Sequence, residues 1–229
     1  MNVSLSSLPQ DAIDSPESDG EPMADNTKQL RWIFVFVGNL MALFREAANV
    51  FVGGNQNWYP VEGQPEIVNA PDAYVVFGRP KGDRGSYQQW EEDDIPMTVV
   101  FEVRSPKNTA KEMEKKRRFY EEHGVEEYYL YDPKKNTLKV WCRRRTAFRR
   151  VSKFTTYVSP RLNIRFDLTG PEMVVYYPDG TPFLTFEVLK AERDRAIRLA
   201  KLSRKARRQQ ATPEELQELD ALEAEMLPP

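Results

Sequence analysis

The stretch Met97-Thr98-Val99-Val100-Phe101-Glu102-Val103-Arg104 decides the fold. Its β-branched and aromatic residues predict a buried strand, which Ser105-Pro106 ends. A helix is expected from about Thr109 to His123, because Gly124 is typical of a helix C-terminus, and a second apolar strand follows at 127–131. Strand, helix and strand in succession predict two parallel strands joined by a right-handed crossover. We therefore expect an α/β (α+β) fold with a central mixed β-sheet flanked by helices.

Further elements are expected on both sides of this unit. A helix from about Thr27 to Ala48 is apolar on nearly all sides, so it should be buried against the sheet. The polar stretch 78–94 predicts a loop at the rim of the functional site. We interpret it as a variable surface insertion in preference to a mobile loop that grips the substrate. Short strands are expected at Val50–Val52, Trp58–Val61, Asp72–Phe77, Leu138–Trp141 (the hairpin partner of 127–131), Arg161–Leu168 and Met173–Tyr177.

The chain is expected to have three parts. Residues 1–26 contain too few apolar groups to pack and should be disordered or extended. Residues 27–188 form the globular domain, and residues 189–229 form a helical C-terminal tail. In the tail, Thr212-Pro213-Glu214-Glu215 is a typical helix start, and the preceding helix carries a weak heptad pattern. We expect the tail to form a homodimer or to pack back on the domain.

Composition excludes several kinds of chemistry. The chain has one cysteine, Cys142, and one histidine, His123, so disulfides, cysteine-based zinc sites and histidine triads drop out. The apolar stretch 32–44 is too short to span a bilayer, which takes about 20 residues. No basic region precedes this stretch, so a signal peptide is not expected. We expect a cytoplasmic protein without membrane contact.

Charge is balanced overall but clustered locally. The net charge is −2, with 33 Lys and Arg against 35 Asp and Glu, so the whole chain does not attract nucleic acid. Each local cluster is either a solvated face balanced by nearby acids or a contact for phosphate. The clusters are Lys115–Arg118, Arg143–Arg145 with Arg149-Arg150, and Arg204-Lys205 with Arg207-Arg208.

Two carboxylates stand out as candidates for a metal site. Asp72 opens one apolar strand and Glu102 ends the next. Either residue alone is ordinarily a turn residue or a solvated acid, but neighbouring strands would bring the two together. Hard cations such as Mg²⁺ are held by one or two carboxylates with water and substrate phosphate. The pair therefore favours hydrolysis of phosphodiester bonds.

The cation that such a site needs is left open by the sequence. The position two residues beyond Glu102, on the same strand face, holds Arg104, which can bind phosphate but is a poor proton acceptor. A lysine from the next helix could serve instead, and Tyr120, four residues after Lys116, would share its face and could fix its position. The candidates on this helix are Lys111, Lys115 and Lys116, of which 115 or 116 can project over the strand ends.

These motifs together resemble the Uma2 family of proposed endonucleases, which is abundant in cyanobacteria. The resemblance covers about residues 18–200 and implies a PD-(D/E)XK nuclease domain with a restriction-endonuclease-like core and Mg²⁺-dependent cleavage of DNA. The motifs that carry it are Pro71-Asp72, Val100–Pro106, Lys116–Tyr120 and Gly124–Pro133.

The resemblance also implies roles for individual residues. Asp72 and Glu102 would be the metal ligands for Mg²⁺ or Mn²⁺, the backbone carbonyl of Val103 a third ligand, and Lys116 a catalytic lysine. Superfamily members often add an acid from the first helix. The only acid there is Glu46, which we keep as an open alternative.

Three functions remain open at this stage. The first is a metal-dependent endonuclease that acts on DNA. The second is a catalytically weak module on a nuclease fold, which binds nucleic acid with Arg104 as a phosphate anchor. The third is a homo-oligomeric scaffold assembled through its C-terminal helices.

Overall fold

The computed structural model describes residue 16 and residues 24–224. The chain divides into two units, Met1–Phe183 and Leu184–Pro229, and each is considered by itself. Most of the predicted disordered or extended segment, residues 1–15 and 17–23, lies outside the described residues. Asn26, at its end, caps the first helix by accepting a hydrogen bond from the Gln29 N–H at 3.0 Å.

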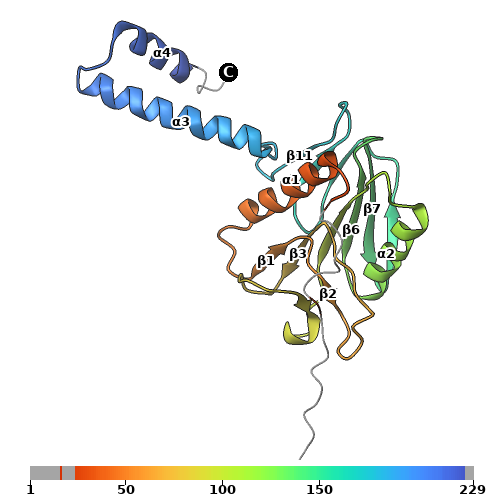
Figure 1. The fold of residues 1–229 in the computed structure, drawn as a ribbon. Coiled ribbons are helices and arrows are strands. Elements are labelled where there is room, and N and C mark those ends of the chain that lie inside the picture. Colours follow the sequence, from red (N-terminus) through yellow and green to blue (C-terminus); the bar gives the residue numbers. More distant parts are fainter. Residues whose placement is uncertain (1–15, 17–23, 225–229) are drawn as a thin grey trace, which may run out of the picture. The chain divides into compact units, whose positions relative to one another are not determined.

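A six-stranded mixed sheet forms the centre of the first unit, in the order β1-β3-β5-β6-β7-β8 (Figure 1). β5 and β6 are parallel, and every other neighbouring pair in this sheet is antiparallel. The predicted parallel crossover and mixed sheet are therefore confirmed. The strands are β1 (Val50–Gly53), β3 (Ala73–Phe77), β5 (Val99–Val103), β6 (Glu127–Asp132), β7 (Thr137–Arg144) and β8 (Ala147–Val151).

Two helices cover the sheet, α1 (Thr27–Leu43) and α2 (Ala110–Glu122) (Figure 1). Side chains alternate along β5, so Phe101 packs with α1 in one buried cluster and Val100 packs with α2 in another. In the first cluster the rings of Phe36 and Phe101 stack at 4.7 Å. α1 ends at Leu43, earlier than predicted, because the chain turns after it to enter β1.

The smaller elements depart more from the sequence prediction. The expected strand 161–168 is reduced to three residues, and β8 and β9 were not predicted. β8 is an edge strand with solvent-facing arginines, so its apolar pattern is weak. The polar stretch 78–94 is not only loop, since it contains β4 and η1. These elements are β2 (Trp58–Tyr59) paired with β4 (Tyr87–Gln88), the 3₁₀ helix η1 (Gln89–Glu91), and a sheet of β9 (Thr156–Val158), β10 (Arg165–Asp167) and β11 (Val174–Tyr176).

The second unit is a helical hairpin of α3 (Phe186–Arg207) and α4 (Pro213–Ala224). The Arg198 guanidinium lies 2.6 Å from the Glu218 carboxylate across the hairpin. Leu202 of α3 and Leu219 of α4 are buried. The heptad positions Leu189 and Ala196 are exposed, so the weak heptad does not mark the buried face of α3. Within the described part of the chain, no helix has the length and apolar character needed to cross a membrane.

Gly54 is required where the chain leaving β1 passes close to Asp72. A Cβ atom at Gly54 would lie 2.5 Å from the Asp72 carbonyl oxygen and 2.7 Å from Val37 Cγ2. We expect Gly54→Ala to lower the free energy of unfolding by about 1–3 kcal/mol, because backbone must shift to accept the methyl group. Urea unfolding measures this change. Gly38→Ala is the control, since nothing lies within 4 Å of its Cβ position, and equal stability of both variants would contradict the prediction.

Candidate active site

Asp72 and Glu102 lie side by side at one end of the central sheet. The antiparallel register that pairs Ala73 with Phe101 continues to bring Asp72 opposite Glu102. Both side chains are buried, with exposed fractions of 7% for Asp72 and 3% for Glu102. Burial of two neighbouring acids is costly unless cations or hydrogen-bond donors compensate for it.

Glu102 receives its compensation from α2. Lys116 Nζ donates to both Glu102 carboxylate oxygens at 2.9 Å, and the Tyr120 hydroxyl donates to Oε1 at 2.5 Å. Lys116 and Tyr120 are four residues apart, so they project from the same helix face. The Lys116 side chain is 27% exposed, whereas the carboxylate beneath it is not. The ammonium therefore forms the solvent-facing layer of the site.

Asp72 is held by the backbone of Val103, which α1 contacts in turn. Its Oδ2 accepts a hydrogen bond from the Val103 N–H at 2.6 Å, and Gln29 Nε2 donates to the Val103 carbonyl oxygen at 3.0 Å. Burial raises the pKa of Asp72 to about 7, and the neighbouring Glu102 carboxylate adds to this rise. The Lys116 ammonium and the Val103 N–H act in the opposite direction.

Tyr120 is a rigid, neutral hydrogen-bond donor beneath the site. Burial raises the pKa of Tyr120 well above its usual value, so the phenol keeps its proton. Its ring is stacked parallel to Trp58 with centroids 6.3 Å apart and lies 5.2 Å from the Tyr128 ring. The sequence prediction had Tyr120 positioning Lys116, but its hydroxyl binds the carboxylate instead.

The structure separates the other candidate cations and acids from this pair. Arg104 Nη1 lies 3.3 Å from Asp132 Oδ2, and its Nη2 donates to the Asn108 carbonyl at 3.3 Å. Lys111 and Lys115 are exposed on α2. The Glu46 side chain is 85% exposed and pairs with Arg45. The alternative that Glu46 joins the site is therefore wrong, because Glu46 follows the end of α1 and faces solvent.

Gln29 is the residue that sequence reasoning missed. It lies in the first turn of α1 and is buried, although it is polar. The signal was its spacing, because Gln29, Trp32, Ile33 and Phe36 share one face of a helix that is otherwise apolar there. A polar residue in a buried stripe needs a partner, and here that partner is the backbone of Val103.

The donor set of this site fits a hard divalent cation. Among the residues that the structure describes, no group of three or more His, Cys, Asp or Glu side chains could hold a metal ion. A pair of carboxylates is nevertheless sufficient for Mg²⁺, which keeps several water ligands. The Val103 carbonyl accepts one hydrogen bond and has a second lone pair. Mutual repulsion of the two acids also favours a cation between them.

Comparison with known proteins gives the family. The Uma2 family, described as "putative restriction endonuclease", matches residues 17–170, and this chain belongs to it. A crystal structure of "a putative nuclease belonging to DUF820 from Anabaena variabilis ATCC 29413" is similar with a TM-score of 0.44 and 14% sequence identity, over 59% of this chain and 72% of that chain. No curated protein matches. The family resemblance predicted from the sequence motifs is confirmed.

Proposed function

We propose that this chain is a metal-dependent endonuclease that hydrolyses phosphodiester bonds in DNA. The observation that carries the proposal is the gathering of the Asp72 and Glu102 carboxylates with the Lys116 ammonium at one end of the sheet. Burying charged groups costs free energy that apolar packing would not require. Because burying these charged groups lowers the stability of the fold, we expect them to have a chemical role. Membership of the Uma2 family supports nuclease function in general.

Mg²⁺ or Mn²⁺ is the cofactor in this proposal. Asp72 and Glu102 would hold the ion, with the Val103 carbonyl as a further oxygen ligand. When bound, such an ion polarises the phosphate and makes water a stronger nucleophile. Asp72 is positioned for this role by the Val103 N–H, and Glu102 by Tyr120.

Lys116 supplies the second positive charge in the mechanism. In the chain without substrate its ammonium neutralises Glu102, from which it lies 2.9 Å. Because the side chain is partly exposed, the same group can contact a phosphate that approaches from solvent. Hydrolysis increases the negative charge on the phosphate oxygens, and a positioned cation stabilises that charge.

A plasmid-nicking assay tests the proposal. We expect the protein to nick supercoiled DNA in Mg²⁺ or Mn²⁺ but not in EDTA, and Asp72→Asn to lower the rate by at least about a thousandfold. Asp167→Asn, in the separate three-stranded sheet, is the matched control and should keep full activity. Cleavage that survives EDTA or Asp72→Asn would refute the mechanism. DNA binding without any cleavage would favour the catalytically weak binding module.

A further inference from the structure

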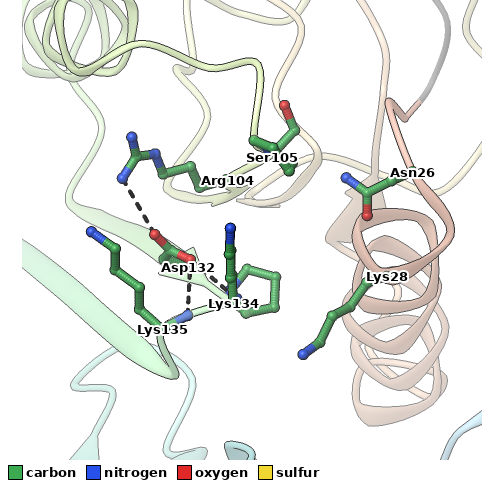
Figure 2. A pocket seen from close by; sticks show the side chains of 9 residues that line it. Asn26, Lys28, Arg104, Ser105, Asp132, Lys134 and Lys135 are labelled. Carbon is green, nitrogen blue, oxygen red and sulfur yellow. Dashed lines mark hydrogen bonds and ion pairs between the residues drawn. The ribbon is translucent and has the colours of Figure 1, made fainter.

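A pocket rich in basic side chains is lined by residues of α1, of the end of β5 and of the β6–β7 turn (Figure 2). Its volume is about 410 Å³. Lys28 comes from the first turn of α1, Arg104 directly follows β5, and Lys134 and Lys135 lie in the turn between β6 and β7. Asp132, at the end of β6, is the one acid among the lining residues. The pocket therefore carries an excess of positive charge in a chain whose net charge is −2.

Asp132 organises the pocket and offsets only part of its positive charge, through its ion pair with Arg104. Its Oδ1 accepts hydrogen bonds from the backbone N–H groups of Lys134 and Lys135, both at 3.1 Å. These bonds fix the turn that carries the two lysines, whose side chains are exposed. Its Oδ2 faces Arg104 at 3.3 Å, as the dashed lines in Figure 2 show. Asp132 thus positions three of the four cationic residues, and the fourth, Lys28, lies 3.9 Å from the Glu172 carboxylate.

One covalent link and one hydrogen bond join the residues of the pocket to the end of β5 that carries Glu102. Arg104 stands two residues after Glu102, a step of about 6.6 Å along an extended chain. Lys28 precedes Gln29, which donates a hydrogen bond to the Val103 carbonyl. Successive base pairs in a duplex rise about 3.4 Å. The backbone positions of Glu102 and Arg104 are therefore separated by about two base-pair rises.

We propose that this pocket binds a phosphodiester group of the DNA backbone next to the phosphate that is cleaved. The proposal rests on the proposed endonuclease function. Arginine presents a planar set of donors that matches phosphate oxygens, and exposed lysines add point charges. Because the chain as a whole is slightly acidic, a local pocket of this kind is needed to hold the polyanion against the two carboxylates. Phosphate binding in the pocket would fix the position of the DNA strand relative to the carboxylates and would carry no preference for base sequence.

Equilibrium binding of DNA by the full-length chain tests the proposal. The probe is a fluorescent duplex without terminal phosphates, and the protein carries Glu102→Gln in EDTA so that no cleavage occurs. We expect Lys134→Gln with Lys135→Gln to weaken binding about tenfold and to reduce the slope of log K against log salt by about 1–2. Lys28→Gln, on a different element, should weaken binding in the same direction.

The matched control is Arg149→Gln with Arg150→Gln, which also removes two exposed neighbouring charges. In the sheet, Arg149 lies opposite Cys142, and Cys142 lies opposite Glu127 at the start of β6. Asp132 of the pocket is at the other end of β6, so the control removes charges away from the pocket. The control should bind DNA as the parent does. Equal weakening in both double variants would overturn the pocket, because the effect would then be general charge loss.

The outcomes separate the pocket from the cleavage chemistry. Weaker DNA binding by the Lys134→Gln, Lys135→Gln variant supports phosphate binding at the pocket, whether or not the protein with native Glu102 cuts DNA. Failure of that protein to cut DNA refutes only the endonuclease function. If this variant keeps the DNA affinity and the salt slope of the parent, the proposal that the pocket binds phosphate is overturned, even when the protein with native Glu102 cuts DNA normally. A loss that appears only on a 5′-phosphorylated duplex also overturns it, because the ligand would be a terminal phosphate.

Discussion

Glu102→Gln is expected to reduce DNA cleavage by at least about a thousandfold while the fold is kept. The substitution preserves shape but removes the negative charge and one of two acceptor oxygens. Lys116 donates to both carboxylate oxygens and Tyr120 to one of them, so at least one of these hydrogen bonds is lost. We expect the free energy of unfolding to fall by about 1–3 kcal/mol for that reason. Single-turnover nicking rates and urea unfolding measure the two effects.

Glu127→Gln is the matched control for this variant. Glu127 is a buried glutamate on the neighbouring strand β6, and it accepts hydrogen bonds from the Tyr129 hydroxyl, Ser159 Oγ and the Arg161 N–H. The same chemical change there should lower stability by a similar amount but leave cleavage unchanged. Comparable loss of cleavage in both variants would show that Glu102 acts through stability alone.

Much of the site could be predicted because its residues lie on strongly patterned elements. The apolar strands around Phe101 and Tyr129 and the helix ended by Gly124 determine the parallel crossover, and that crossover brings α2 over Glu102. Helical spacing then limits which lysine can reach the carboxylate. The sequence could not choose between Arg104 and the helix lysines, because the choice depends on where Asp132 lies in the folded chain.

The features that were missed depend on contacts between distant or solvent-facing residues. Gln29 contacts Val103, 74 positions away, so no local pattern reveals the hydrogen bond. β8 is stabilised by pairing with β7, although only Phe148 among its own side chains is buried. In the tail, the weak heptad does not give the buried face of α3, since Leu189 and Ala196 are exposed whereas Leu202 is buried. The helix that pairs with α3 is α4, through Arg198 and Glu218. Dimer formation through the tail stays a prediction.

Lys116→Met is expected to slow cleavage by about 100-fold to 1,000-fold, the usual cost of losing one donor to a developing negative charge. The methionine keeps most of the length of the side chain but removes the ammonium. Lys115→Met is the matched control, because Lys115 is the adjacent exposed lysine on the same helix. Cleavage rates at saturating DNA and Mg²⁺ measure the difference. Equal rates in the two variants would remove Lys116 from the mechanism.

A second measurement separates a chemical role of Lys116 from a structural one. The ammonium lies 2.9 Å from both Glu102 oxygens, so it competes with a divalent cation for the same carboxylate. Lys116→Met should therefore bind Mn²⁺ more tightly than the parent, by about tenfold, in calorimetric titration. Damage to the fold would weaken metal binding and cleavage together. Tighter Mn²⁺ binding together with slower cleavage is expected only if Lys116 acts on the phosphate. In that case the two carboxylates still hold the metal, but the positive charge that stabilises the reacting phosphate is missing.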